Sequence, residues 1–357
     1  MNKYGLLVTS PVGPDKNIGD YIQSLAALQY VGKNYSFVEK EKVAELGSSD
    51  KIKVIMNAWY MWHPENWPPK EESIDPLLTS IHITPITAEQ MLADGGKEYF
   101  IKHGPVGCRD TGTLDILQKH GVPCYFSGCL TLTLGRTYNY EGEREGIIFV
   151  DPYFPPIRYV NEESTIYYPM NGLKSIYYFL KSPKKVAKLA QKPFFKGRVK
   201  LQTYYNASMF YHAYSSMFID DVLMNAEYIS HMVSVSKTTD HESLLGTAEN
   251  LLHKYAKAKL VVTSRIHCAL PCLGLETPLI FVLDKMMDSE KNIFNAPNRF
   301  GGLLDLFRLA VYSNNKVLAN DEELKNRGII TNDISIKNKG NWRKYRDELI
   351  EKCLSFV

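Results

Sequence analysis

The stretch KLVVTSRIHCALPCLGLETPLIFVLD, residues 259–284, joins two short apolar runs through a segment of helical length. Residues 260–264 and 278–284 are rich in β-branched and large apolar side chains, which is typical of buried strands. A strand, a helix and a second strand in this order predict a parallel sheet with helices on both faces. Arg265 and His267 then lie at the carboxyl end of the first strand. Removing these polar side chains from water costs free energy, so their position indicates a structural or functional role.

Strands and helices are predicted to alternate over most of the chain. Predicted strands cover 4–9, 52–61, 77–84, 122–128, 146–151 and 228–236, and predicted helices cover 20–31, 111–121, 242–259 and 341–356. This pattern predicts an α/β protein with two Rossmann-like domains facing a cleft, similar to the GT-B glycosyltransferase fold. We place an N-terminal domain at 1–156, a Tyr- and Lys-rich helical connecting region at 157–220 and a C-terminal domain at 221–340. A C-terminal helix at 341–357 is expected to pack back on the N-terminal domain.

The composition is that of a soluble globular protein, with 45% apolar and 23% charged residues. The net charge of +3 is too small to indicate nucleic-acid binding. The longest apolar region, 258–283, is interrupted by Arg265, His267 and Glu276, so we expect no transmembrane segment. The N-terminal run is too short for a signal peptide, and the six cysteines form no pair of CxxC motifs, so we expect reduced thiols and a cytoplasmic protein.

Residues 264–267 are candidates for an anion site, because the carboxyl end of a parallel strand meets the first turn of the next helix there. Arg265 would bind a carboxylate or phosphate through two parallel hydrogen bonds, and His267 would donate or accept a proton. A salt-bridged arginine and a hydrogen-bonded structural histidine are an equally good interpretation. Pro271 lies inside the predicted helix and should kink it or delay its start.

The loop SPVGPDKNIGD, residues 10–20, predicts a matching site in the other half of the chain. Gly13 and Gly19 allow a tight turn, and Asn17 or Asp20 can cap the following helix. The loop lacks the lysine and hydroxyl residue of a P-loop and contains no GxGxxG motif. The sequence therefore gives little support for binding of ATP or a dinucleotide at this loop. Asp20 could be a helix cap and nothing more.

Arg109 stands where a short predicted strand runs into a helix that Asp110 or Thr111 could cap. Its alternative is a surface ion pair with Asp110, which would contribute only about 0 to 1 kcal/mol.

The segment NAWYMWHPENWPP, residues 57–69, concentrates aromatic side chains in a loop. Trp59, Trp62 and His63 could form a platform for a sugar, or they could cover an edge of the core. His82 falls in a predicted strand, where a hydrogen-bonded core histidine is the usual interpretation and a contact with an acceptor is the alternative. The sequence shows no metal-binding motif and no GxSxG motif.

Taken in order, these stretches resemble the polysaccharide pyruvyl transferase family. The resemblance rests on NIGDYIQSLAALQYV, NAWYMWHPENWPP with PLLTSIHIT, GCRDTGTLDILQKHGVPCYFSGCLTLTL, YAKAKLVVTSRIHCALPCLGLETPLIFV and NRFGGLLDLF, and it covers nearly the whole chain. Many relatives have a glycine after the histidine, where this chain has Cys268.

The resemblance implies a GT-B-like fold and transfer of pyruvate from phosphoenolpyruvate to two hydroxyls of one sugar, giving a cyclic ketal and phosphate. His267 would be the general acid, and Asp20 is a candidate base. Arg265, Arg109, Ser264, Asn17 and Gly19 would bind the donor on the C-terminal side. Trp59, Trp62, His63 and His82 would bind the acceptor on the N-terminal side. No metal and no cofactor besides the co-substrate phosphoenolpyruvate is expected.

The acceptor would be a sugar in a precursor of a surface polysaccharide, such as a capsule or exopolysaccharide, linked to a lipid or a nucleotide. The basic tail from 337 to 346 is either a solvated helix face or a peripheral contact with the inner face of the membrane. Two other functions remain open at this point. One is a GT-B glycosyltransferase that binds a nucleotide sugar through Glu276 or a neighbour, and the other is a non-catalytic sugar-binding member of a polysaccharide assembly system.

Overall fold

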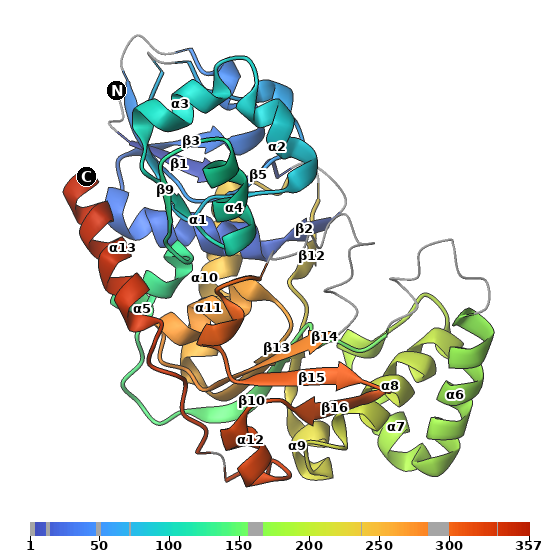
Figure 1. The fold of residues 1–357 in the computed structure, drawn as a ribbon. Helices are drawn as coiled ribbons and strands as arrows, with labels where there is room; N and C mark the ends of the chain where they lie inside the picture. The colour runs from blue at the N-terminus through green and yellow to red at the C-terminus, as the bar shows by residue number, and fades with distance from the viewer. Residues whose placement is uncertain are drawn as a thin grey trace.

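The computed structural model describes residues 4–11, 15–47, 51–70, 73–155, 167–236, 238–284, 300–333 and 335–357, without side chains for 167–170. Gly13 and the beginning of the predicted connecting region, 157–166, lie outside the described residues. The described residues form a mixed α/β fold with several parallel sheets and many helices (Figure 1). The predicted α/β class is therefore confirmed.

A four-stranded parallel sheet occupies the N-terminal part of the chain, in the order β3 (Tyr35–Glu39), β1 (Tyr4–Val8), β4 (Ile52–Met56), β6 (Ile74–Leu78). Helix α1 (Ile18–Val31) follows β1 and buries most of its length. Asn17 caps this helix, since its Oδ1 accepts a hydrogen bond from the Gly19 N–H. Gly32 ends it with a φ of 71°, a conformation that favours glycine.

A six-stranded sheet occupies the C-terminal part, in the order β11 (Glu227–Ile229), β10 (Glu145–Val150), β13 (Ala258–Thr263), β14 (Leu279–Asp284), β15 (Leu309–Ser313), β16 (Lys316–Ala319). All neighbouring strands are parallel except the last pair. Helices α10 (His241–Lys257) and α11 (Ile266–Gly274) flank β13 in the chain. Strand β10 belongs to this sheet although it precedes residue 156, so the change from one sheet to the other occurs before Glu145.

Smaller elements complete the fold. Three two-stranded sheets are β2 (Asp15–Asn17) with β12 (Met232–Ser234), β5 (Trp59–Tyr60) with β7 (His82–Ile83), and β8 (Val106–Cys108) with β9 (Cys124–Phe126). The remaining α-helices are α2 (Pro85–Leu92), α3 (Gly96–His103), α4 (Thr111–Lys119), α5 (Gly135–Tyr138), α6 (Tyr167–Lys181), α7 (Pro183–Ala190), α8 (Lys200–Tyr214), α9 (Asp220–Asn225), α12 (Glu322–Arg327) and α13 (Arg343–Phe356). Short 3-10 helices are η1 (Lys40–Glu45), η2 (Pro64–Asn66), η3 (Leu130–Thr133), η5 (Pro193–Phe195) and η7 (Leu304–Leu306).

Three predicted strands are wrong in their continuity. The strand predicted over 52–61 divides into β4 and β5, which belong to different sheets. The strand predicted over 77–84 divides into β6 and β7, because Ser80 turns the chain with a φ of 53°. The strand predicted over 228–236 divides into β11 and β12 at His231, whose carbonyl accepts a hydrogen bond from the Ile18 N–H instead of continuing the sheet.

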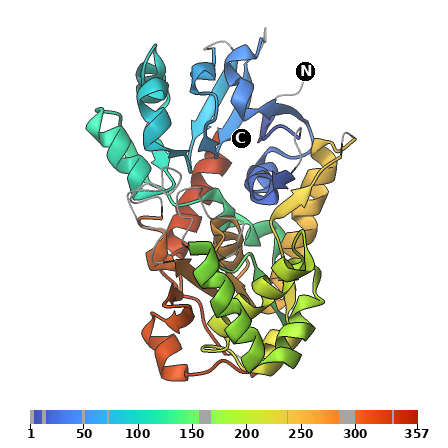
Figure 2. The same ribbon diagram turned by 90° about the vertical axis from the view of Figure 1, so that its right-hand side faces the viewer.

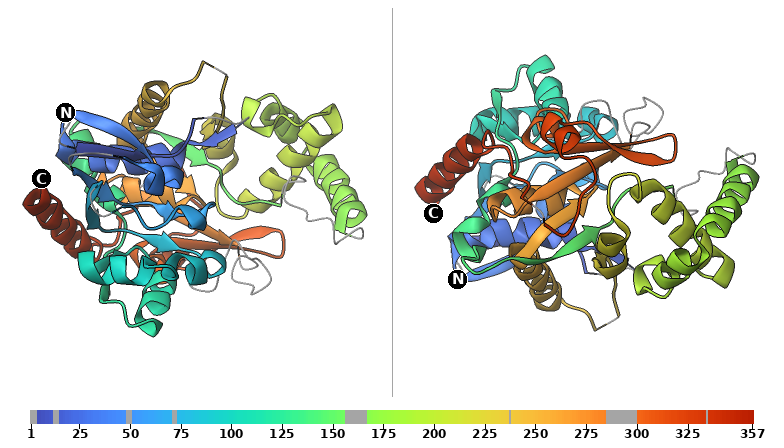
Figure 3. Two further views of the ribbon diagram at one scale, coloured as in Figure 1. Left: turned by 90° about the horizontal axis from the view of Figure 1, so that it is seen from above. Right: turned by 90° about the horizontal axis from the view of Figure 1, so that it is seen from below.

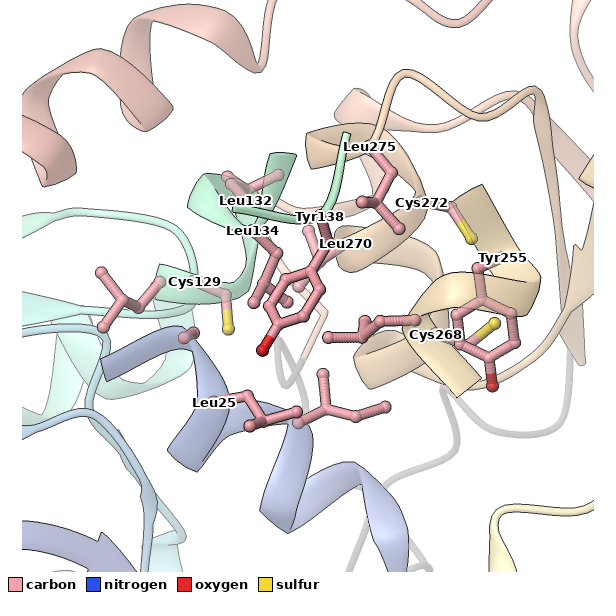
Figure 4. Packing of buried hydrophobic residues seen from close by; sticks show 14 of the residues in the cluster. Leu25, Cys129, Leu132, Leu134, Tyr138, Tyr255, Cys268, Leu270, Cys272 and Leu275 are labelled. Atoms are coloured by element: carbon pink, nitrogen blue, oxygen red, sulfur yellow. The ribbon is translucent and has the colours of Figure 1, made fainter. Parts of the chain in front are cut away.

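One hydrophobic cluster joins the two halves of the chain. It contains Leu25 of α1, Cys129, Leu132, Leu134 and Tyr138 of the η3–α5 segment, Tyr255 of α10, and Cys268, Leu270, Cys272 and Leu275 of the α11 segment (Figure 4). Helix α13 adds Leu349 and Cys353, and Lys53 donates a hydrogen bond to the Phe356 carbonyl. In the described parts of the chain, every helix is too short or too polar to cross a membrane.

Candidate active site

The beginning of α11 is built from backbone-bonded hydroxyl residues at the end of β13. The Thr263 hydroxyl donates to the Val150 carbonyl (2.7 Å), and the Ser264 hydroxyl donates to the Val282 carbonyl (2.6 Å). Arg265 is the N-cap residue of α11 and contributes no capping side-chain bond. The positive end of the helix dipole therefore lies beside Ser264 and Arg265, which are both predicted to bind the donor. The hydrogen bond of the Ser264 hydroxyl also fixes the position of this turn against β14.

Pro271 does not delay the helix, contrary to one of the two expectations. Helix α11 begins at Ile266 and runs through Pro271 to Gly274, although the proline removes the N–H that would bond to the carbonyl of His267. Leu270, Pro271 and Cys272 are buried, so packing offsets the lost hydrogen bond.

Arg265 is held by Asp151, which directly follows β10 in the six-stranded sheet. Arg265 Nε donates to Asp151 Oδ2 at 2.9 Å, and the same carboxylate oxygen accepts from the His231 N–H at 2.9 Å. The Arg265 side chain keeps 32% of its surface exposed, compared with 15% for Asp151. The ion pair therefore orients the guanidinium through Nε and leaves part of it accessible.

His267 lies where three distant segments meet. A Cβ atom added to Gly19 would stand 2.9 Å from His267 Cβ and 3.2 Å from its Nδ1, so the first turn of α1 touches the histidine side chain. Arg109 Nη1 is 3.4 Å from His267 Nε2. The histidine is partly exposed, and it is therefore contacted by protein and still open to a ligand.

Arg109 is buried, with 3% of its surface exposed, beside a pair formed by His82 and Asp110. Asp110 Oδ2 lies 2.6 Å from His82 Nδ1 and 3.5 Å from Arg109 Nε, and its Oδ1 accepts from the Thr113 N–H to cap α4. Burial alone would raise the pKa of Asp110, but the His82 and Arg109 charges and these hydrogen bonds outweigh it and lower the pKa. These contacts favour the charged form of Asp110 and place its carboxylate beside the Arg109 guanidinium.

Asp20 borders a cavity of about 10 Å³, enough for a single water molecule or hydroxyl group. Lys40, Gln23 and Trp59 also line it, and Gln23 Oε1 is a buried acceptor without a hydrogen-bond partner in the described structure. Asp20 is partly exposed, yet the surrounding protein desolvates its carboxyl group. This desolvation raises the pKa of Asp20 from 3.8, and the charges of Lys40 and Arg109 oppose the change without cancelling it.

The predicted acceptor residues fall into two places. Trp59 lines the Asp20 cavity and packs edge-on against Trp62, with ring centroids 4.7 Å apart. Trp62 is 60% exposed, and His63 is exposed and pairs with Glu65 at 2.9 Å. His82 is instead 2% exposed and contacts Asp110, so it is not open to an acceptor in this conformation.

The structure adds three residues that the sequence interpretation missed. Asp151 orients Arg265, Lys40 faces Asp20 across the cavity, and His231 links Asp151 to Tyr255, whose hydroxyl lies 2.7 Å from His231 Nε2. Asp151 could have been found from the sequence, because it follows the apolar run GIIFV as Ser264 follows LVVT. Lys40 and His231 carried no comparable signal.

The described residues contain neither a cluster of metal-binding side chains nor a disulfide. In the described ranges, no group of three or more His, Cys, Asp or Glu side chains could hold a metal ion. All six cysteines are free thiols, and Cys268, the residue after His267, is fully buried.

Comparisons with known proteins identify the family. The family model described as polysaccharide pyruvyl transferase matches residues 17–284, well over half of the chain. The match runs from Asn17 in the loop before α1 to the end of β14, and it includes Arg109 and the turn from Ser264 to His267. Neither the curated proteins nor the solved structures contain a match to this chain.

Proposed function

The chain belongs to the polysaccharide pyruvyl transferase family, and we propose that it transfers pyruvate from phosphoenolpyruvate to two hydroxyls of a sugar in a surface-polysaccharide precursor. The products would be a cyclic ketal and inorganic phosphate. The proposal is carried by one observation, the meeting of Arg109, His267 and the Asn17–Asp20 loop from three segments far apart in the sequence.

The donor would lie between the two arginines at the N-terminus of α11. Phosphoenolpyruvate carries up to three negative charges, and Arg109, Arg265 and the helix dipole supply positive charge where His267 is found. Asp110 and Asp151 would act as positioning residues, each holding one guanidinium in place.

His267 would donate a proton to the methylene carbon C3 of the donor. The resulting cation at C2 is attacked by the first sugar hydroxyl, and a second hydroxyl then displaces phosphate from C2. General acid catalysis of this kind typically contributes about 10² to 10⁴-fold.

Asp20 would take the proton of each attacking hydroxyl in turn; one of these two protons would return to His267 and the other would leave with the phosphate. Its raised pKa brings it closer to the neutral range than an ordinary aspartate, which suits a general base. Trp59 and Trp62 extend from the Asp20 cavity to the surface and would supply an aromatic platform for the sugar.

The two larger sheets would form the Rossmann-like domains of a GT-B-like arrangement, with the acceptor bound on the N-terminal side and the donor on the C-terminal side. We further propose a cytoplasmic enzyme whose acceptor is linked to a lipid or a nucleotide. No cofactor besides the co-substrate would be needed.

A nucleotide-sugar glycosyltransferase is less well supported, because the residue expected to bind the ribose is engaged elsewhere. Glu276 lies beyond the other end of α11, whose seven residues after His267 extend about 10 Å at 1.5 Å per residue. Both oxygens of its carboxylate accept hydrogen bonds from Arg343 of α13, at 2.8 and 3.1 Å.

The test is phosphate release from phosphoenolpyruvate in the presence of a panel of sugar acceptors. We expect turnover with at least one acceptor, loss of turnover in His267→Ala, and normal turnover in His120→Ala, an exposed histidine of α4's C-terminal cap. Thermal stabilisation by phosphoenolpyruvate but not by UDP or GDP would accompany it. Stabilisation by a nucleotide alone, or turnover unchanged in His267→Ala, would refute the proposal.

A further inference from the structure

Helix α6 presents a stripe of large apolar side chains to solvent. Leu173, Ile176, Tyr177 and Leu180 are 69%, 52%, 54% and 69% exposed. Their spacing of three and four residues places them on one face of the helix. An exposed apolar stripe of this kind usually marks a surface that meets a partner or a membrane.

The opposite face of α6 is firmly packed, so the stripe does not arise from a loose helix. The Tyr178 ring stacks on His212 of α8 with centroids 3.6 Å apart, and Phe179 packs edge-on against Tyr204. Helices α6, α7 and α8 stand together at one extremity of the molecule (Figures 1 and 3), and α6 lies in front of the body of the protein in Figure 2. The stripe therefore lies on an outer surface.

The net positive charge of the chain is concentrated in the same region. Residues 164–219 contain eight lysines, one arginine and no acidic residue, a charge of +9, whereas the rest of the chain has 33 basic and 39 acidic residues, a charge of −6. Lys181 extends its ammonium group over the exposed Tyr177 ring, 4.6 Å from the centroid. Lys184 and Lys188 of α7 are exposed, whereas Lys185 pairs with Asp220.

We propose that α6 and α7 dock this protein on a membrane surface that contains anionic lipids. The four apolar side chains would insert at the boundary between headgroups and acyl chains, and the flanking lysines would reach the lipid phosphates. A membrane fits better than a folded acidic partner, because the stripe lies along one helix at the outside of the molecule and lysines extend beside it. This inference does not rest on the proposed transferase activity.

The basic tail at 337–346 is the other candidate for a membrane contact. Arg343 is bound by Glu276, and Arg346 donates to Asp347 at 2.8 Å. The arginines of the tail are thus neutralised within the protein, whereas Lys184 and Lys188 lie in a segment without acidic residues.

Co-sedimentation of the full chain with vesicles tests the proposal. Wild type should bind vesicles of phosphatidylcholine with phosphatidylglycerol, and should bind pure phosphatidylcholine at least tenfold more weakly. Leu173→Glu with Leu180→Glu should lower binding at least tenfold. Lys184→Gln with Lys188→Gln should lower it about 25-fold, at about fivefold per lysine. Ile329→Glu, at an exposed apolar residue outside α6 and α7, is the matched control and should bind as wild type does.

Circular dichroism and thermal unfolding will verify that each variant is folded. If the variant with two apolar residues replaced does not fold, the variant with two lysines replaced still tests the proposal. Equal binding to both kinds of vesicle, or wild-type binding by either double variant, would overturn the proposal. It would also be overturned if light scattering showed a dimer that Leu173→Glu with Leu180→Glu dissociates, since the stripe would then join two copies of the chain.

Discussion

Gly19→Ala should disable the site while leaving the fold intact. The new Cβ would lie 2.9 Å from His267 Cβ, whereas carbon atoms in contact are ordinarily about 3.5 to 4.0 Å apart. His267 or the first turn of α1 must therefore move by about 0.6 to 1.1 Å, and a misplacement of about 1 Å near reacting groups costs about 10²-fold in rate. This corresponds to about 2.7 kcal/mol of activation free energy, at 1.36 kcal/mol for each factor of ten.

Gly246→Ala is the matched control for this experiment. Gly246 lies inside α10, and an added Cβ there would meet nothing within 4 Å. Both glycines are helical, Gly19 in the first turn of α1 and Gly246 in the interior of α10, where alanine is favoured over glycine by about 1 kcal/mol. Phosphate release should fall about 100-fold in Gly19→Ala and stay unchanged in Gly246→Ala.

A double variant separates contact with His267 from other effects of Gly19→Ala. Combined with His267→Ala, which keeps the Cβ but removes the imidazole, the Gly19 change should cause no further loss of any residual activity, because the acid that it would misplace is absent. Wild-type turnover in Gly19→Ala, or a full additional 100-fold loss in the double variant, would show that the Gly19 contact does not set the position of His267.

Three further predictions concern the charged groups around the site. Asp151→Asn should raise the KM for phosphoenolpyruvate about tenfold by releasing Arg265, with a loss of only about 1 kcal/mol of stability in urea unfolding, because the ion pair is partly exposed; an unchanged KM would contradict this role. Burial raises the pKa of Asp20 above 3.8, so the folded protein binds more protons than the unfolded chain just above pH 3.8 and loses stability as the pH rises through that range. Asp20→Asn should therefore raise the urea midpoint more at pH 7 than at pH 4, and an equal rise at both pH values would be evidence against a desolvated carboxylate. The same change should abolish turnover, because it removes the proposed base. His82→Ala should lower the free energy of unfolding by about 3 kcal/mol, since it leaves the buried Asp110 charge without its 2.6 Å partner; a loss below about 1 kcal/mol in urea unfolding would argue against this pairing.

The position of Arg265 and His267 was predictable because it depends on local pattern. The sequence places an apolar run at 260–264, a segment of helical length after it and a second apolar run at 278–284. The structure forms β13, α11 and β14 there. The ends of these elements follow from the same residues, since Thr263 and Ser264 use their hydroxyls to bind neighbouring strands.

The contacts of Arg109 and Gly19 with His267 were not predictable, because they depend on packing between distant segments. Helix α1 lies against α10 and α11, and this packing brings Gly19 to the imidazole. No short-range pattern in the sequence encodes that arrangement. The role of His82 depends in the same way on Asp110, which comes from the next strand and helix along the chain.

The membership of residues 145–150 in the second sheet was also missed. The run GIIFV predicts a strand, but the same apolar pattern would suit the first sheet equally well. Pairing decides the matter, since Val150 lies beside Thr263 in parallel register. Asp151 and Arg265 are neighbours for this reason.

The hydrophobic cluster shared by α1, η3, α11 and α13 has a mechanical consequence. Separating the two sheets at each turnover would remove leucine and tyrosine side chains from the hydrophobic core that both sheets share. We therefore expect substrates to enter and leave through rearrangement of surface loops, with the catalytic groups held at a nearly fixed spacing throughout the cycle.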